Sequence, residues 1–408
     1  MRILFLSQYF YPETFKGNDL VFELKKRGHD VIVVTGKPNY PEGRFFAGYG
    51  FFKKNVEVLQ GVTVYRLPLI PRGKGAVLGV ALNYLSFYVS SRIFFIFGKP
   101  DFKADVIIGQ QLSPVTSSIP GLWYKNKLKV PLITWVLDLW PESLIANSPI
   151  KKGIVIDQLE KMVKRLYHGS DLLLMSSRSF EGPIQSRGVD HKKLSYFPNW
   201  AEDVFSSTPP SEKTFPPLPA GFNIVYAGNL GESQDFPNVI KAIQTLGKGS
   251  GINWIFVGGG RFADGLKQLA SEQQLDNVYL YPPHPVDFMP SLFKQANAML
   301  LTLKGGSMIS QTVPAKMQTY MSAGKMILAM IDGEAHQLMI ESDCGWVAQA
   351  GDYSTLAKNA RSMASMSLDE VKLKEDNSLS FYQKYFTKDQ AISKVEMKIK
   401  ELVSNDQA

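Results

Sequence analysis

Residues 311–341 read QTVPAKMQTYMSAGKMILAMIDGEAHQLMIE, a pattern typical of a loop, a helix, a strand, a glycine turn and a second helix. Two helix starts therefore lie beside one strand end, near Pro314 and near residues 333–334. A helix N-terminus presents unpaired N–H groups and a partial positive charge, which can hold a diphosphate. Lys316, in the first turn, adds a mobile cation. An ordinary helix–strand–helix unit has the same spacing, so both interpretations stay open here.

The rest of the chain alternates strand-like and helix-like segments. Strand-like apolar runs in the first half occupy residues 3–7, 31–35, 56–59, 62–66, 106–109, 132–136 and 172–176, and those in the second half occupy 224–227, 254–257, 278–280 and 299–303. Continuous apolar runs indicate parallel strands that are covered on both faces. The alternation predicts an α/β fold of two Rossmann-like, doubly wound domains.

A proline-rich segment, SSTPPSEKTFPPLPAG at 206–221, separates the two halves. Such proline density is typical of a linker. We therefore expect an N-terminal domain at 1–205, a C-terminal domain at 222–380, and a charged C-terminal helix at 381–408, with packing back on the N-terminal domain as one option. Because ligands bind at the carboxyl ends of strands in such sheets, the two domains are expected to face each other across a ligand-binding cleft.

Bulk composition excludes several classes of protein. The 408 residues carry a net charge of +8, five His and a single Cys. One cysteine excludes an internal disulfide framework and a multi-cysteine zinc site, and the scattered histidines predict no structural metal. The positive charge fits an anionic membrane or a phosphorylated substrate, whereas the lack of Lys/Arg blocks disfavours nucleic acid. The start, MRILFLSQYF, lacks signal-peptide features, so a cytoplasmic protein is expected.

An uncharged segment, GAVLGVALNYLSFYVSS at 75–91, has Arg72 and Lys74 before it and Arg92 after it. Three interpretations fit this segment: a membrane span, a buried helix, or a helix whose outer face touches lipid while the basic flanks meet anionic headgroups. We favour the third, which predicts peripheral contact with the inner face of the cytoplasmic membrane.

Two carboxylates follow the strand at 132–136, in the sequence WVLDLWPES. Asp138 lies where α/β sites are formed and could act as a base or accept a hydrogen bond from an acceptor hydroxyl. Capping a turn is its structural alternative. Glu142 is the neighbouring candidate for the acceptor.

Glycine-containing turns supply the remaining local signals. In the first half, SQYFYPETFKGNDLVFEL holds Gly17, which would let the backbone approach a donor, and Asn18, a candidate acceptor contact or, more simply, a helix cap. In the second half, YAGNLG contains Gly228 and Asn229, and FVGGGR contains Gly258. Two such turns in one sheet favour a nucleotide site. GxGxxG, P-loop, GxSxG and CxxC patterns are absent from the sequence, which disfavours the corresponding enzyme classes.

Together these motifs resemble glycosyltransferase family four, a retaining family of the GT-B fold. The chain is most similar to the bacterial surface-polysaccharide branch that transfers N-acetyl-fucosamine-type amino sugars. The resemblance covers nearly the whole length through SQYFYPETF, TGKPNYPEG, LNYLSF, DLWPES, PNWAEDVF, YAGNLG and PAKMQTYMSAGKMILA. It implies a UDP-sugar donor held by the C-terminal half and a lipid-linked or saccharide acceptor held by the N-terminal half. It also implies no metal, no further cofactor, and a role in O-antigen, capsule or exopolysaccharide synthesis.

The resemblance also locates departures from the family pattern. The pyrophosphate-binding Arg and Lys of the family fall on Asn229 and Gln234, and its E-x7-E pair falls on Gln311 and Thr319. Lys316 is then the nearest replacement cation. The site expected from sequence comprises Asp138, Lys316 and Gln311 for catalysis; Gly17, Gly228, Asn229, Gln234, Gly258, Lys316, Thr319 and Glu334 for the donor; and Asn18 and Glu142 for the acceptor. Glu334 could instead only stabilise its helix start. A UDP-sugar epimerase of the same fold and a degenerate, non-catalytic homologue remain alternatives.

Overall fold

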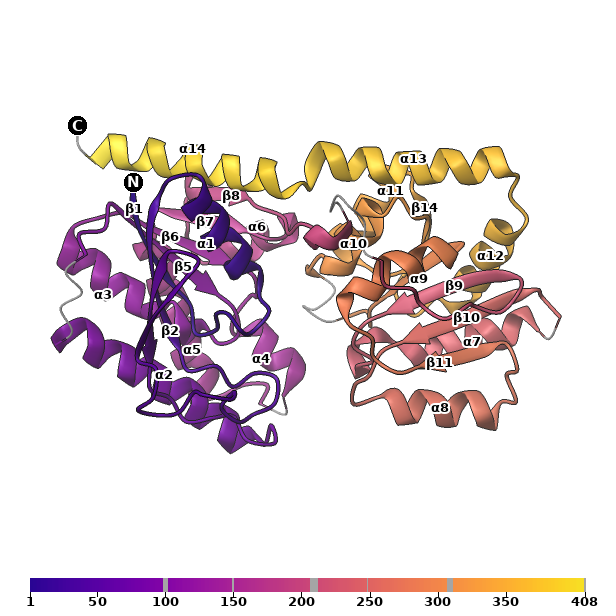
Figure 1. Cartoon of the computed structure of the whole chain (residues 1–408), viewed down its shortest axis with the longest axis horizontal. Coiled ribbons are helices and arrows are strands. Elements are labelled where there is room, and N and C mark those ends of the chain that lie inside the picture. Colours follow the sequence, from indigo (N-terminus) through magenta and orange to yellow (C-terminus); the bar gives the residue numbers. More distant parts are fainter. Residues whose placement is uncertain (98–101, 149, 206–211, 248, 307–310, 407–408) are drawn as a thin grey trace. The chain divides into compact units, whose positions relative to one another are not determined.

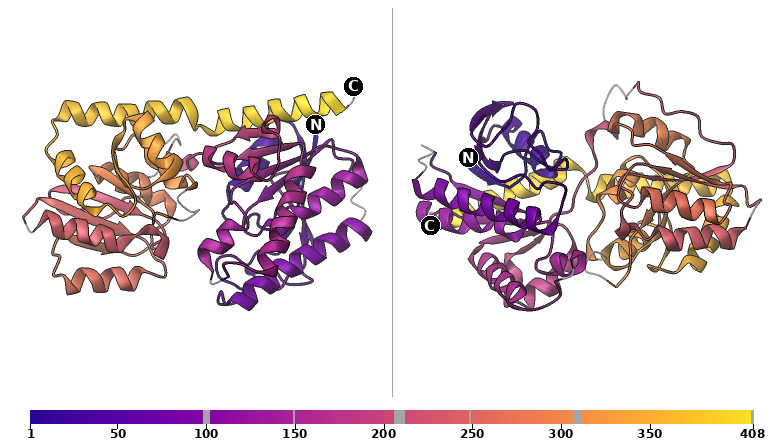
Figure 2. Two further views of the ribbon diagram at one scale, coloured as in Figure 1. Left: turned by 180° about the vertical axis from the view of Figure 1, so that it is seen from behind. Right: turned by 90° about the horizontal axis from the view of Figure 1, so that it is seen from below.

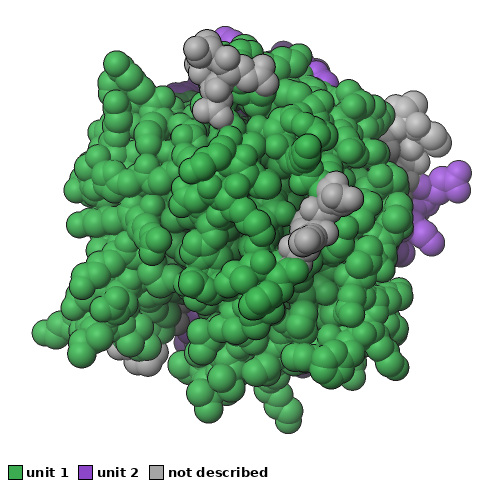
Figure 3. All heavy atoms as spheres, turned by 90° about the vertical axis from the view of Figure 1, so that its left-hand side faces the viewer, with its two compact units in different colours: residues 1–198, 391–408 green, residues 199–390 purple. Residues whose placement is uncertain are grey.

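The computed structural model describes residues 1–97, 102–148, 150–205, 212–247, 249–306 and 311–406 (Figure 1). The chain forms two compact units, Met1–Pro198 with Ala391–Ala408, and Asn199–Gln390 (Figures 2 and 3). Each unit has its own largely parallel sheet with helices packed on it. The predicted α/β class with two Rossmann-like domains is confirmed.

The first unit is built on an eight-stranded sheet in the order β3-β4-β2-β1-β5-β6-β7-β8. Its strands are β1 (Arg2–Leu6), β2 (Asp30–Gly36), β3 (Val56–Leu59), β4 (Val62–Leu67), β5 (Val106–Gln111), β6 (Leu132–Val136), β7 (Leu172–Met175) and β8 (Leu194–Tyr196). Neighbouring strands are parallel, except that β3 pairs antiparallel with β4. Every residue of β5 and β6 is buried, as expected for covered parallel strands.

Helices of the first unit connect these strands. They are α1 (Lys16–Lys26), α2 (Val77–Phe97), α3 (Ile119–Leu128), α4 (Glu142–Asn147), α5 (Ile154–Gly169), α6 (Glu181–Gln185) and, from Ala391 onward, α14 (Lys388–Asp406). The strand order reverses direction at β1, which has β2 on one side and β5 on the other. Loops after β1, β2, β5 and β6 therefore lie at the edge of the sheet where doubly wound folds bind ligands.

The second unit has a six-stranded, fully parallel sheet in the order β11-β10-β9-β12-β13-β14. Its strands are β9 (Phe222–Ala227), β10 (Ile252–Val257), β11 (Val278–Tyr281), β12 (Ala298–Thr302), β13 (Ile327–Met330) and β14 (Gly345–Ala348). Alternate residues of β9 enter different apolar clusters, Ile224 and Tyr226 in one and Val225 and Ala227 in the other. This is the period of a strand with both faces covered.

Figure 1 shows the helices of the second unit around its sheet. Their buried side chains belong to both apolar clusters. These helices are α7 (Phe236–Leu246), α8 (Ala263–Glu272), α9 (Met289–Gln295), α10 (Ala315–Ser322), α11 (Gly333–Ser342), α12 (Tyr353–Ala364) and α13 (Leu368–Tyr385). Residues 311–341 thus contain the helix, strand and helix that their sequence predicts.

The boundary between the units differs from the predicted linker at 206–221. Residues 206–211 lie outside the described residues, but the described part of the segment belongs to the second unit. Phe215 is buried in an apolar cluster there, and its N–H donates to Ser291 Oγ at 3.1 Å. Prolines exclude regular structure but not packing, so this stretch is an ordered covering segment.

The predicted start of the C-terminal helix, at residue 381, is also wrong, because α14 begins at Lys388. The structure has two helices, α13 and α14, with Phe386 buried between them in the sequence. The α14 side chains contact the first unit: Glu396 pairs with Arg27 at 2.6 Å and with His29 at 2.7 Å, and Lys394 donates to the carbonyl of Tyr196.

The uncharged segment at 75–91 forms most of helix α2. Asn83, Phe87, Ser91 and Phe95 form its buried face. Leu78, Leu82, Leu85, Val89, Ile93 and Ile96 are exposed on the remaining surface. Among the described residues α2 is the one helix long and apolar enough to cross a membrane, and 22% of its most apolar window is buried. The alternative of a fully buried helix is therefore wrong.

Candidate functional site

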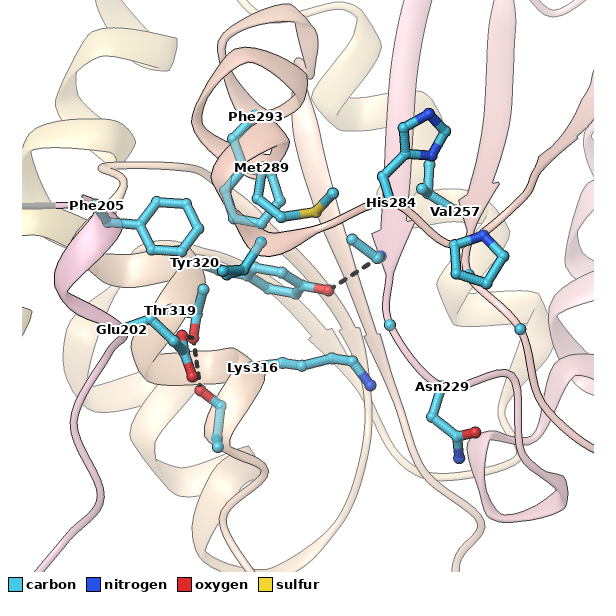
Figure 4. A pocket seen from close by; sticks show the side chains of 17 residues that line it. Glu202, Phe205, Asn229, Val257, His284, Met289, Phe293, Lys316, Thr319 and Tyr320 are labelled. Atoms are coloured by element: carbon cyan, nitrogen blue, oxygen red, sulfur yellow. Dashed lines mark hydrogen bonds between the residues drawn. The ribbon is translucent and has the colours of Figure 1, made fainter. Parts of the chain in front are cut away.

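A pocket of about 520 Å³ lies in the second unit at the carboxyl ends of β9, β10 and β11. The turns after these strands form one wall, and helix α10 forms another. Strand order reverses between β9 and β12, so the pocket occupies the switch point of the sheet. Figure 4 shows Asn229 and His284 on one side, Glu202, Phe205 and Thr319 on the other, and Lys316 between them.

Two glycines make this wall possible. Gly258 follows β10 with φ +153°, and a Cβ there would lie 1.9 Å from the carbonyl oxygen of Gly228. Gly228 follows β9 with φ +132°, and a Cβ there would lie 2.6 Å from Lys316 Cε. The two turns therefore pack against each other and leave a channel for the lysine, which larger residues would close.

Lys316 extends along this channel to a tyrosine instead of a carboxylate. Its Nζ donates to the hydroxyl of Tyr226 at 2.7 Å and lies 4.5 Å from the centre of that ring. Burial lowers the pKa of the Lys316 ammonium to about 8. Throughout the described part of the chain, no carboxylate forms an ion pair with this lysine. A dianionic ligand entering the pocket would supply the missing charge.

The hydroxyl of Tyr226 links the lysine to Asn229 and Gln234, the two positions at which the family resemblance implies cations. It lies 2.7 Å from the carbonyl oxygen of Asn229 and 3.1 Å from Gln234 Oε1, both acceptors. Gln234 thus reaches the site through Tyr226 and does not itself line the pocket. Asn229 lines it directly.

A carboxylate that sequence reasoning missed also lines the pocket. Thr319 Oγ1, one turn after Lys316 on α10, lies 2.7 Å from Glu202 Oε2 and donates to it. Glu202 precedes the short turn Asp203–Phe205, far from α10 in the sequence. The motif PNWAEDVF contains this glutamate, but nothing local in that motif indicates a site.

The remaining wall is apolar. Phe205 stacks on Phe293 with ring centres 5.0 Å apart, and Met289 and Val286 lie beside them. His284 also lines the pocket, and its Nδ1 lies 2.8 Å from the carbonyl oxygen of Pro282. None of these residues was predicted from the sequence. An apolar wall with a few polar or charged groups opposite it is typical of a pocket for a small molecule.

Two other predicted residues do not line the pocket. Glu334 is buried in the first turn of α11, next to Asp332, whose carboxylate accepts the N–H of Ala350 at 2.9 Å. Gln311 is half-buried and follows residues 307–310, which lie outside the described part. Of the predicted donor residues, the pocket brings together Gly228, Asn229, Gly258, Lys316 and Thr319.

Asp138 lies in the first unit, directly after β6. Its Oδ2 accepts a hydrogen bond from Ser113 Oγ at 2.8 Å, and Trp140 Nε1 donates to the same serine at 3.1 Å. Burial raises the pKa of the Asp138 carboxyl above its usual range. A carboxylate in this environment is held in one orientation by two neighbouring loops, and its role in catalysis stays a prediction.

Glu142 has a structural partner. Its carboxylate accepts a hydrogen bond from Arg187 Nη2 at 2.6 Å, and the same nitrogen lies 2.9 Å from Glu160. These carboxylates hold the pKa of Arg187 above its usual value. Glu142 therefore has a structural role in this ion pair. Its contact with the sugar acceptor stays a prediction.

Gly17 and Asn18 both serve local packing in α1. A Cβ on Gly17 would lie 2.5 Å from Gln110 Oε1, so the helix approaches β5 closely. Asn18 accepts the N–H of Tyr11 at 3.0 Å and donates to the carbonyl of Glu13 at 2.6 Å. The N-cap of α1 is Phe15, so the predicted capping role of Asn18 is wrong: its amide holds the preceding loop.

Among the described residues, no group of three or more His, Cys, Asp or Glu side chains is arranged to hold a metal ion. The expectation that no metal or further cofactor is needed stays a prediction. The groups that line the pocket are one ammonium, two glycine turns, a carboxylate–hydroxyl pair and an apolar wall.

Known proteins resemble the chain over most of its length. A Glycosyl transferase 4-like domain matches residues 18–200, and the family Glycosyl transferases group 1 matches residues 217–378. WcaI of Escherichia coli K12, whose name assigns it to colanic acid biosynthesis as a glycosyl transferase, is 27% identical over 328 residues, 78% of this chain and 79% of its own. WbjE of Pseudomonas aeruginosa, named a glycosyltransferase, is 27% identical over 281 residues, 66% and 68% of the two chains.

Solved structures show the same fold. Sucrose-phosphate synthase from Thermosynechococcus elongatus has a TM-score of 0.72 at 13% identity and covers 99% of both chains. HepE of Anabaena, solved with UDP and glucose, has a TM-score of 0.66 at 14% identity over 98% of this chain and 100% of its own. Glycosyltransferase family models match both halves of the chain, and the two units together match solved GT-B glycosyltransferases. The chain is therefore a glycosyltransferase of the GT-B fold, which fits its resemblance to glycosyltransferase family four.

Proposed function

We propose that the protein is a retaining glycosyltransferase that moves a sugar from a UDP-sugar to a lipid-linked or saccharide acceptor in bacterial O-antigen, capsule or exopolysaccharide synthesis. The observation that carries this proposal is Lys316, a buried ammonium without a carboxylate partner among the described residues, at the N-terminus of α10. The name of WcaI supports a polysaccharide product, and the UDP in the HepE structure supports the nucleotide.

The leaving diphosphate would bind at Lys316, beside the glycine turns. The first turn of α10, with Ala315 and Lys316, and the turns at Gly228 and Gly258 line the same part of the pocket. These groups are fixed before the reaction, so they stabilise the negative charge that develops as the sugar–phosphate bond breaks. The apolar wall of Phe205, Met289 and Phe293 would then take the base.

The acceptor would bind to the first unit, with Asp138 orienting its hydroxyl. In the retaining reaction the acceptor oxygen forms a bond to the anomeric carbon on the face that the diphosphate leaves. The acceptor proton passes to an oxygen of that diphosphate, and the sugar–phosphate bond breaks. We propose that this reaction needs no metal and that the sugar is an amino-deoxy sugar of the N-acetyl-fucosamine type.

Helix α2 would bring the protein to a lipid-linked acceptor. Leu85, Val89 and Ile93 are 56%, 45% and 53% exposed on one side of the helix. Arg72 and Lys74 precede the helix, and Arg92 lies within it. Apolar side chains that insert between headgroups, with basic residues beside them, favour peripheral binding to an anionic membrane at the cytoplasmic side.

A transfer assay tests the activity. The protein is incubated with UDP-N-acetylfucosamine and related UDP-sugars together with a polyprenyl-diphosphate saccharide, and UDP release is measured. We expect UDP and a longer saccharide with the retained anomeric configuration by NMR. Conversion of the donor without an acceptor would instead favour an epimerase, and no donor binding in calorimetry would favour a non-catalytic homologue.

Vesicle flotation tests the membrane contact separately. Leu85→Asp and Ile93→Asp should abolish binding to vesicles that contain anionic phospholipid, because each places a charge where lipid chains would lie. Val58→Asp is the matched control, since Val58 is 67% exposed on the edge strand β3. Equal binding by all three variants would remove α2 as the contact.

A further inference from the structure

The pair Glu202–Thr319 has a feature that the family pattern does not explain. The E-x7-E pattern that the family resemblance implies would place a carboxylate at Thr319, and this chain has a hydroxyl there. The structure nevertheless has a carboxylate at that place, because Glu202 Oε2 lies 2.7 Å from Thr319 Oγ1 and both residues line the pocket (Figure 4). The carboxylate in this wall of the pocket therefore comes from a segment that lies 117 positions from Thr319 in the sequence.

Packing on both sides fixes the backbone of Glu202 within the second unit. Trp200 is fully buried, Asp203 forms an ion pair with Lys388 at 2.5 Å, and Phe205 stacks on Phe293. With anchors two residues before it, and one and three residues after it, the glutamate is held at the pocket wall. A binding group needs such fixed support to select one ligand over another.

The position of Glu202 relative to Lys316 suits one part of a nucleotide. Lys316 and Thr319 are three residues apart on α10, a rise of about 4.5 Å along the helix axis. If Lys316 holds the diphosphate and the apolar wall takes the base, the group between them in the ligand is the ribose. Its 2′ and 3′ hydroxyls are donors, and a carboxylate is an acceptor with room for several donors.

We propose that Glu202, oriented by the hydroxyl of Thr319, binds the ribose hydroxyls of the donor and makes the pocket selective for ribonucleotides over 2′-deoxyribonucleotides. This inference rests on the proposed function, because it needs a nucleotide in the pocket. It adds a binding residue from the segment between the two family domains, at a position outside both matched ranges.

Calorimetry with UDP and 2′-deoxy-UDP tests the proposal on the full-length protein. We expect the wild type to bind UDP roughly ten- to a hundredfold more tightly than 2′-deoxy-UDP, the range expected for a hydrogen bond to a charged group. In Glu202→Ala the two affinities should become nearly equal, mainly through weaker binding of UDP. The double variant Glu202→Ala/Thr319→Glu returns the carboxylate to α10 and should recover the preference.

Asp203→Asn is the matched control, because it removes a carboxylate from the next residue, which pairs with Lys388 outside the pocket. Its preference for UDP should equal that of the wild type, and thermal unfolding without ligand checks that each variant is folded. A full preference in Glu202→Ala would overturn this inference alone. A wild type that binds no nucleoside diphosphate would overturn the donor site and this inference together.

Discussion

The ammonium of Lys316 passes beside Gly228 and donates to the hydroxyl of Tyr226, 2.7 Å away. The same hydroxyl lies within hydrogen-bonding distance of Asn229 and Gln234, the two positions at which the family resemblance implies cations. The neutral replacements thus organise a tyrosine that holds a single cation from another helix. The cation of this pocket thus lies on α10, and the loop after β9 supports it through Tyr226.

Removing this cation should weaken donor binding. Lys316→Ala is expected to lower the affinity for UDP by about 1.5–3 kcal/mol, the worth of a hydrogen bond to a charged group. Isothermal calorimetry measures the change. Lys267→Ala removes the same charge from an exposed position on α8 and should leave the affinity unchanged. Equal affinities for the wild type and Lys316→Ala would show that the lysine does not contact the donor.

Blocking the channel should have the same effect as removing the lysine. In Gly228→Ala the new Cβ would lie 2.6 Å from Lys316 Cε, so the flexible side chain must move away from Tyr226. We expect a loss of UDP affinity close to that of Lys316→Ala, and little further loss when the two changes are combined. Gly182→Ala, where a Cβ meets nothing within 4 Å, is the control. Additive losses would contradict a shared mechanism.

Donor affinity should also depend on pH. Burial lowers the pKa of Lys316 from 10.5 to about 8, and the diphosphate binds its charged form. Affinity for UDP should therefore be constant near pH 7 and fall as the pH rises through 8 toward 10, whereas Lys316→Ala should lack this fall. The stability of the ligand-free protein should change with pH in the opposite direction. Between pH 8 and 10.5 the folded protein has lost the proton of Lys316 while the unfolded chain still binds it, so the free energy of unfolding rises with pH over this range.

Much of the fold could be predicted because its central strands carry local signals. The run at 132–136 is β6 residue for residue, since a strand covered on both faces must be apolar throughout. Strands β8 and β14 were missed. Each lies at a sheet edge, is short, and is largely half-buried, so its identity depends on pairing with β7 or β13 and not on its own pattern.

The residues of the site likewise fall into those that local sequence features predict and those that depend on contacts with distant residues. Gly228, Gly258 and Lys316 could be found because glycine turns and helix starts are local features of the sequence. Glu202 could not, because its carboxylate acquires a role only through Thr319, 117 positions away. The proline-rich stretch misled for a related reason: its prolines indicate no regular structure, but the burial of Phe215 depends on a cluster formed by distant residues.

Asp138 offers a test of the acceptor side. Asp138→Asn keeps an oxygen that can accept from Ser113 but removes the charge that orients the acceptor hydroxyl, so turnover should fall by about 100-fold, the cost of a misplaced reacting group. UDP affinity should stay unchanged, because the donor pocket belongs to the second unit. Steady-state kinetics and calorimetry separate the two effects. A variant that only melts at lower temperature would identify Asp138 as a turn-stabilising residue.

Because of Glu13, we expect the stability of the folded protein to depend on pH even without a bound donor. The buried carboxylate of Glu13 accepts the N–H groups of Asn39, Tyr40 and Phe10 at 2.8, 2.7 and 3.3 Å and so ties the loop after β1 to the loop after β2. Burial nevertheless raises the pKa of Glu13 from 4.5 to about 7. The folded state thus keeps a proton that the unfolded state loses, and this stabilisation is complete below pH 4.5 and lost as the pH rises through 7.

The size of this term follows from the two pKa values, at about 1.4 kcal/mol for each pKa unit, and is of the order of 3 kcal/mol. Glu13→Gln cannot ionise and keeps an oxygen for Asn39 and Tyr40. Urea unfolding from pH 4.5 to 7.5, followed by circular dichroism, should show the wild type losing stability relative to this variant as the pH rises. A constant difference between the two proteins across that range would mean that Glu13 is already ionised in the folded state at pH 5, held by its three backbone donors.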